Sequence, residues 1–184
     1  MDKKRVIIIA FFVLVTFLLF GQEETGYQQS GTIFSLKLTP SFEIPIGTDR
    51  DIFNYGGGVD LSAVLQPAGQ SLVYFSSDLS YSFIPTQKAD LSVSRFSLGA
   101  GAGLNFGLIG NLSLFANTRA GYYYGFLNDG SGTSQGNPFV SAGLGLAYQF
   151  TKRISLGVGA SYNSYLGFYN NWSISLGTAF RLSS

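Results

Sequence analysis

The chain has 184 residues, of which only 11% are charged, whereas 16% are aromatic and 24 are glycine. Soluble domains carry about 25% charged residues, so this composition disfavours a domain that is surrounded by water. The chain contains no cysteine and no histidine, which excludes disulfides, thiolate metal sites and an imidazole base or metal ligand.

The first 21 residues are predicted to be a cleaved secretory signal peptide. Lys3, Lys4 and Arg5 precede an apolar run over residues 6–20, and Gly21 marks the change to polar sequence. A basic start, a short apolar run and a small residue are typical of such a peptide. The run is short for a membrane span of about 20 residues, although an uncleaved anchor is the alternative. No cysteine follows, which excludes lipoprotein processing.

Residues 22–30 are polar and are predicted to form a short periplasmic segment. Without the basic and acidic residues at positions 2–5, the 11 basic and 10 acidic residues become 8 and 9. Binding to nucleic acid requires a basic surface, so this balance argues against nucleic acid as a partner.

Eight later segments place large apolar residues at every second position, and each is predicted to be a β-strand. The positions between them are mostly Gly, Ser, Asn and Ala. No later stretch repeats at the helical period, so the chain is predicted to be all-β. The segments are 34–43, 59–66, 73–83, 95–106, 112–124, 140–150, 154–163 and 172–182.

The connections between these segments alternate in length. Tight turns are predicted at 67–70, 107–110 and 151–152, and longer polar links at 45–54, 85–90, 127–137 and 166–171. Short turns at one end and long loops at the other are typical of transmembrane β-barrels. An even strand number places both chain ends at the short-turn end, the periplasm. Leu91 and Val93 are out of phase, which predicts a bulge or a strand that extends beyond the bilayer.

Alternation alone does not tell which face is inside, because a soluble ligand-binding barrel has the same period. An eight-stranded barrel has room for few side chains, and the apolar face is too bulky to fit inside it. Every charge within a strand falls on the small polar face, as expected if the other face contacts lipid, where Arg or Lys costs about 2–4 kcal/mol. These residues form a predicted network in the lumen: Lys37, Glu43, Asp60, Asp78, Arg95, Arg119 and Arg181.

Aromatic residues gather at both ends of the apolar faces, as in the two interfacial belts of membrane barrels. Toward the long loops they are Phe42, Tyr81, Phe83, Tyr122, Tyr124, Tyr162 and Trp172, and toward the short turns Phe34, Phe106, Tyr148, Phe150 and Phe180.

The last strand, with Ser175, Gly177, Phe180 and Leu182, resembles the C-terminal assembly signal of bacterial outer-membrane β-barrels. In strand number and loop asymmetry, the chain resembles the small eight-stranded barrels that include the OmpA transmembrane domain and OmpX. The resemblance implies an antiparallel up-and-down transmembrane β-barrel over residues 31–184, located in the bacterial cell outer membrane. It also implies insertion by the outer-membrane assembly machinery and contact with outer-membrane lipids, and we expect a monomer.

In the lumen, Lys37, Asp60, Asp78 and Arg119 are expected near mid-height. Glu43 and Arg95 are expected nearer the loops, and Arg181 at the periplasmic rim. Buried charges are costly unless they are paired, so we expect ion pairs. These pairs would form either an ion gate or proton path, or a plug that fixes strand register. The plug is favoured because the lumen is narrow. A small channel is the second interpretation, and a secreted ligand-binding barrel is the third.

No enzyme activity and no cofactor are predicted. Some small outer-membrane barrels modify lipids, but those enzymes use a histidine that this chain lacks. Asp60 and Asp78 form a conceivable acid–base pair, although basic residues are expected to neutralise them. The glycines at 99, 101 and 103 lie within a strand, which excludes a nucleotide-binding loop. They are expected instead to leave space for Arg95, Phe115, Arg119 and Tyr123. The sequence around Asp49 and Asp51 has too few regularly spaced oxygens for a calcium loop.

The long loops are the expected place for a surface ligand. Residues 128–137 are small and polar, and are predicted to be mobile. Tyr165, Phe168 and Tyr169 form an aromatic loop tip, which is interpreted either as a contact for lipid headgroups or a partner, or as an extension of the aromatic belt. The second interpretation is favoured.

Overall fold

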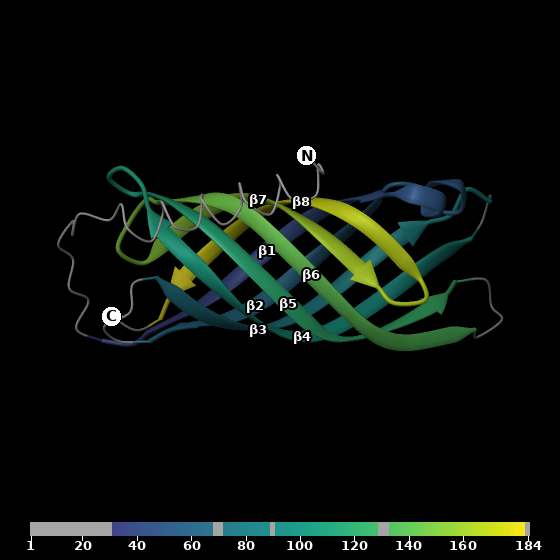
Figure 1. Cartoon of the computed structure of the whole chain (residues 1–184), viewed down its shortest axis with the longest axis horizontal. Coiled ribbons are helices and arrows are strands. Elements are labelled where there is room, and N and C mark those ends of the chain that lie inside the picture. Colours follow the sequence, from purple (N-terminus) through teal and green to yellow (C-terminus); the bar gives the residue numbers. More distant parts are fainter. Residues whose placement is uncertain (1–30, 68–71, 89–90, 129–132, 183–184) are drawn as a thin grey trace, which may run out of the picture.

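The computed structural model describes residues 31–67, 72–88, 91–128 and 133–182, which form a closed barrel of eight β-strands (Figure 1). Each strand pairs antiparallel with the next one along the chain, and the last pairs with the first. This up-and-down all-β architecture confirms the predicted fold class. The predicted signal peptide (1–21) and the segment 22–30 lie outside the described residues. The strands are β1 (Ile33–Pro45), β2 (Gly56–Gln66), β3 (Val73–Pro85), β4 (Ser92–Gly107), β5 (Leu112–Leu127), β6 (Ser134–Gln149), β7 (Ile154–Tyr165) and β8 (Tyr169–Arg181).

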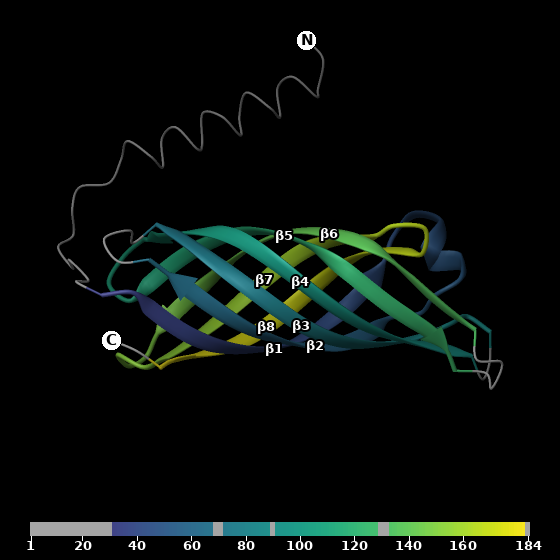
Figure 2. The ribbon, with the colours of Figure 1, turned by 90° about the horizontal axis from the view of Figure 1, so that it is seen from below.

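The strands run obliquely to the long axis of the barrel in both views (Figures 1 and 2). Pairing between β3 and β4 is unbroken from Val73 opposite Leu104 to Pro85 opposite Ser92. The predicted bulge near Val93 is therefore wrong. Val93 lies in the inward register of a regular strand and is 6% exposed, so the change of phase reflects an apolar residue inside the barrel.

Side chains alternate between the two faces of the barrel wall, because successive residues of a strand point in opposite directions. The large apolar residues point outward; Leu98, Leu144 and Leu176 are 63%, 62% and 59% exposed. Most interior positions carry small and polar residues together with the charges, and buried apolar residues lie among them near one end of the barrel. This placement confirms the predicted orientation, and it contradicts the third interpretation, in which the apolar face lines the interior.

The connections at the two ends of the barrel differ less in length than the sequence predicts. At one end, here called the loop end, the connections are 46–55, 86–91, 128–133 and 166–168. At the other, the turn end, they are 67–72, 108–111 and 150–153. The long link predicted at 166–171 is wrong, because β7 and β8 extend to Tyr165 and Tyr169 and leave a three-residue turn. Likewise, β6 begins at Ser134 and includes part of the predicted mobile loop, of which residues 129–132 lie outside the described chain.

The connection between β1 and β2 contains a short 3₁₀ helix, η1 (Gly47–Asp51), at the right of Figure 1. Within the described ranges, no helix is long and apolar enough to cross a membrane.

Glycines let large interior side chains approach the barrel wall closely. A methyl group on Gly145 would lie 2.5 Å from Phe115 Cζ, and one on Gly101 would lie 2.8 Å from Arg119 Cγ. The prediction that the glycines at 99, 101 and 103 leave space for interior side chains is therefore confirmed for Arg119 beside Gly101, whereas the space for Phe115 is left by Gly145 on β6. Gly99, on β4 like Gly101, makes room for Phe139, because a methyl group on Gly99 would lie 2.9 Å from Phe139 Cζ.

Candidate functional site

The interior near the loop end holds a buried ion pair between β4 and β1. Arg95 Nη2 lies 2.7 Å from Glu43 Oε1, and the two side chains are 1% and 5% exposed. Both groups were predicted to lie near the loops. Removing two charges from water is costly, so this pair depends on the polar groups that surround it.

Hydrogen bonds from three other strands hold this ion pair in place. Arg95 Nη2 donates to Ser82 Oγ at 2.7 Å, and Asn171 Nδ2 donates to Glu43 Oε2 at 3.0 Å. Asn163 Nδ2 in turn donates to Asn171 Oδ1 at 2.7 Å, which orients the Asn171 amide. Because β1, β3, β4, β7 and β8 all contribute to the network, the ion pair links walls on different sides of the barrel.

Tyr165 and Tyr169 lie inside the barrel mouth, so the predicted exposed loop tip is wrong for both residues. They are 7% and 0% exposed, because the hairpin continues as regular strands in which both residues fall in the inward register. The Arg95 guanidinium carbon lies 3.6 Å from the centroid of the Tyr165 ring. Such a stack stabilises a desolvated cation by about 2 kcal/mol. Phe168 lies in the turn itself, is partly buried and packs against the apolar cluster at the loop end.

An apolar cluster surrounds these two rings at the loop end, and the sequence analysis missed most of it. Its buried members, here called the mouth cluster, are Phe53, Ile84, Val93, Tyr123, Phe139, Tyr165 and Tyr169. All except Phe53 belong to strands and share the inward register of the polar residues. That parity was a usable signal, since apolar residues on the polar face near strand ends can only pack inside the mouth.

Phe53 reaches the mouth from the connection between β1 and β2. Its ring centroid lies 5.0 Å from that of Tyr169. Its backbone forms a β-bridge with Thr86, in the connection between β3 and β4. Asp49 Oδ2 accepts hydrogen bonds from the backbone N–H and the side chain of Asn170, at 2.9 and 3.1 Å. Two connections and the start of β8 are thereby tied together over the mouth cluster.

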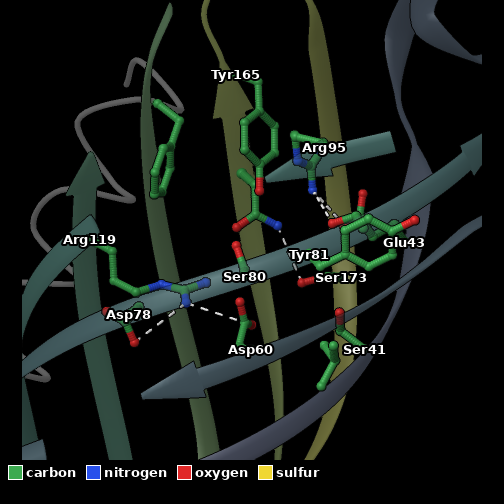
Figure 3. A pocket seen from close by; sticks show the side chains of 14 residues that line it. Ser41, Glu43, Asp60, Asp78, Ser80, Tyr81, Arg95, Arg119, Tyr165 and Ser173 are labelled. Atoms are coloured by element: carbon green, nitrogen blue, oxygen red, sulfur yellow. Dashed lines mark hydrogen bonds and ion pairs between the residues drawn. The ribbon is translucent and has the colours of Figure 1, made fainter. Parts of the chain in front are cut away.

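At mid-height, Arg119 lies between two carboxylates, as Figure 3 shows. Its Nη1 atom is 3.7 Å from Asp60 Oδ2 and 3.9 Å from Asp78 Oδ1. Ser76 Oγ donates a hydrogen bond to Asp78 Oδ2 at 2.9 Å. The charged atoms of this group are farther apart than those of the Arg95–Glu43 pair. The Arg119 side chain is also 18% exposed, so the group is more accessible to water. The predicted pairing of interior charges is confirmed for these residues and for Glu43 and Arg95.

Lys37 and Arg181 differ from Arg95 and Arg119, because no ion pair within 4.0 Å joins either of them to another described residue. Lys37 Nζ lies 4.9 Å from the centroid of the Phe115 ring instead. Gly177 makes room for this side chain, since a methyl group there would lie 2.7 Å from Lys37 Cε. Arg181 is half-buried at the turn end, as predicted for the rim.

Between the two ion groups lies a cavity of about 20 Å³. It is lined mainly by polar residues, among them Ser41, Asp60, Ser80 and Ser173 (Figure 3). A cavity of this size holds about one water molecule. Among the described residues, no group of three His, Cys, Asp or Glu side chains could hold a metal ion.

The predicted aromatic belt and assembly residues occupy the exterior and the final strand. Tyr122, Tyr124, Tyr162 and Trp172 point outward near the loop end, with exposures of 55%, 52%, 36% and 49%. Phe180 and Leu182 point outward at the turn end and are 47% and 60% exposed, whereas Ser175 and Gly177 lie in the inward register. Among the other predicted belt residues, Phe106 is an exception, because it is only 5% exposed.

Comparison with solved structures identifies the same architecture in small outer-membrane barrels. Neisserial surface protein A (NspA) matches with a TM-score of 0.59 and 19% identity, covering 83% of this chain and 96% of that chain. OprG from Pseudomonas aeruginosa matches with a TM-score of 0.56 and 9% identity over 84% and 98% of the two chains.

A third match is Ail, the attachment invasion locus protein of Yersinia pestis, with a TM-score of 0.53 and 16% identity over 82% and 97% of the two chains. No family model matches this sequence. No curated protein matches it either. These similarities show that the fold is that of the eight-stranded outer-membrane β-barrels.

Proposed function

We propose that this chain is an integral β-barrel of the bacterial outer membrane, with a structural or surface-interaction role. The observation that carries the proposal is the exposed apolar exterior around a charged interior. Outward residues such as Leu98 and Leu144 are more than half exposed over the middle of the wall. Soluble monomers rarely expose apolar patches larger than a few hundred Å², whereas lipid favours such a surface.

The proposed lumen is closed to ions. An ion that crosses the barrel has to pass the mouth cluster and then the Arg95–Glu43 pair, whose side chains are 1% and 5% exposed. Opening that path would separate two desolvated charges, which costs several kcal/mol. The interior therefore acts as a support that joins opposite walls. This reading is favoured over the small channel.

The role is proposed to be non-enzymatic. The sequence contains no histidine and no cysteine, so neither a Ser–His nor a Cys–His nucleophile can be assembled. Asp60 and Asp78, the one carboxylate pair considered for acid–base chemistry, both lie beside Arg119. Arg119 therefore offsets the charge of both carboxylates, as expected of a structural ion group rather than of an acid–base pair.

A surface ligand would bind at the loop end. Ile52 and Tyr55 are 55% and 65% exposed there, next to the cations Arg50 and Lys88. Ail has been solved in complex with the heparin analogue sucrose octasulfate, which is a precedent for ligand binding to a barrel of this architecture. For assembly, we propose that the final strand with Phe180 and Leu182 is recognised by the barrel assembly machinery.

Membrane insertion is tested by a matched pair of substitutions at Leu144. Leu144→Lys places a charge on the proposed lipid-facing surface and costs about 2–4 kcal/mol, whereas Leu144→Met keeps an apolar chain of similar length. The fraction folded into phospholipid vesicles is measured from heat-modifiable gel mobility. We expect a large loss for lysine and little change for methionine. Equal folding of the two variants, or solubility of the wild type without detergent, would contradict the proposal.

Closure of the lumen is tested by recording currents from the purified wild-type protein in planar bilayers. We expect no steady conductance above that of the lipid alone. A large, steady conductance from the monomer would support the channel interpretation instead.

A further inference from the structure

The turn end of the barrel carries only positive charge among its described residues. Lys152 and Arg153 lie in the connection between β6 and β7, and Arg181 ends β8. Every described Asp and Glu lies at mid-height or nearer the loop end: Glu43, Asp49, Asp51, Asp60 and Asp78. The loop end, by contrast, carries charges of both signs, since Asp49, Arg50 and Asp51 lie in the connection 46–55 and Lys88 in the connection 86–91.

These cations are held by a structured turn. Thr151 Oγ1 accepts hydrogen bonds from the backbone N–H groups of Arg153 and Ile154, at 3.2 and 3.0 Å. The Arg181 N–H donates to the Arg153 carbonyl oxygen at 2.8 Å, which fixes β8 beside the turn. The backbone under the charges is therefore ordered before any ligand binds, and less entropy is lost on binding.

Exposed rings flank the charges on the outer wall. Phe150, Tyr148 and Phe180 are 58%, 45% and 47% exposed, and the centroids of Phe150 and Tyr148 lie 4.9 Å apart. Aromatic residues of this kind sit at the boundary between acyl chains and headgroups. Lys152 and Arg153, which are both exposed at the adjoining turn, are then at headgroup height.

We propose that Lys152 and Arg153 form a binding surface for an anionic phospholipid headgroup in the leaflet at the turn end. The phosphodiester is attracted by the cations and accepts their N–H hydrogen bonds, while the acyl chains lie along Phe150 and Tyr148. Arginine suits this role because its planar fork can donate two hydrogen bonds to one phosphate. The inference rests on the proposed membrane insertion.

The test measures lipid retention by the full chain in detergent containing equal amounts of phosphatidylglycerol and phosphatidylethanolamine. Native mass spectrometry reports which lipid remains bound. We expect phosphatidylglycerol to be enriched on the wild type. Each basic residue near an anionic surface contributes about 1 kcal/mol, so we expect the enrichment to fall about fivefold for Lys152→Gln and further for K152Q/R153Q.

Two controls make the result specific. Lys88→Gln removes one cation from the loop end and should leave the enrichment unchanged, and Lys152→Arg should retain it. Heat-modifiable mobility of each variant verifies folding. A chain that folds into vesicles but shows equal retention of the two lipids would overturn the headgroup site and leave membrane insertion intact.

Glu23 and Glu24 are the acidic residues that precede β1 in the sequence, and the test includes them as the alternative partner for the same cations. If enrichment depended on Lys152 and Arg153 only in an E23Q/E24Q background, the patch would belong to that acidic segment and the lipid proposal would be wrong.

Discussion

The two halves of the barrel interior are stabilised in different ways. In the half near the loop end, charged and amide side chains form short hydrogen bonds around Arg95 and Glu43, beneath a cluster of rings. In the half near the turn end, Phe115 and Tyr74 lie against glycine positions, and Lys37 lies over the Phe115 ring. Specific polar pairs therefore stabilise the half near the loop end, whereas close packing against the backbone stabilises the half near the turn end. The two halves should respond to different substitutions.

The largest effect is expected from Glu43→Ala. The substitution leaves Arg95 buried without its carboxylate, which costs about 3–5 kcal/mol. Urea unfolding of the protein in lipid vesicles measures the loss. Adding Arg95→Met to the same chain should recover part of it, because the stranded charge is then removed. A loss below about 1 kcal/mol for Glu43→Ala would mean that the loop-end half does not depend on this pair.

The second-largest effect is expected in the half near the turn end, from Gly145→Ala. The added methyl group would overlap the Val158 carbonyl oxygen and would lie 2.5 Å from Phe115 Cζ. Overpacking of this kind costs about 1–3 kcal/mol. Gly107→Ala is the matched control, since its methyl group would meet nothing within 4 Å. Equal unfolding midpoints for the two variants would show that the ring and strand separate without cost.

Tyr165→Leu tests the ring that stacks on Arg95. The substitution keeps an apolar side chain but removes the cation–π contact, so we expect a loss of about 1–2 kcal/mol in the same unfolding assay. Tyr165→Phe retains the ring and should stay close to the wild type. If phenylalanine were as destabilising as leucine, the hydroxyl group rather than the ring face would be the stabilising part.

The smallest effect is expected for Asp78→Asn at mid-height. Arg119 lies 3.9 Å from Asp78 but keeps Asp60 at 3.7 Å, and it is partly exposed, so we expect a loss of about 1 kcal/mol or less. A loss of stability as large as that of Glu43→Ala would show that the partly exposed group around Arg119 matters as much as the buried Arg95–Glu43 pair.

Much of the fold could be predicted from alternation alone. Residues such as Leu98 and Leu144 had to share a face because the strand period is two, and the volume of an eight-stranded barrel decided which face was outside. The same parity placed Glu43, Arg95 and Arg119 inside. Strand number and the antiparallel order followed from the spacing of the turns.

The partners within the interior could not be predicted in the same way. Arg95 and Glu43 are 52 residues apart, on β4 and β1, which are not neighbours in the barrel. Their meeting depends on the stagger accumulated over three pairs of strands. Tyr165 and Tyr169 were misassigned for a more local reason. Rings near a polar turn fit both a belt and a mouth, and only the continued strand register directs them inward.

The chain has a single tryptophan, Trp172, and its place on β8 gives the protein an internal optical reporter. The indole is on the outer wall, with its centroid 5.7 Å from the Tyr162 ring of the preceding strand. Since β8 closes the barrel by pairing with β1, the wavelength of tryptophan emission will follow the last hairpin as it enters an apolar solvent. Fluorescence of the unlabelled wild type can thus time the closing step of folding.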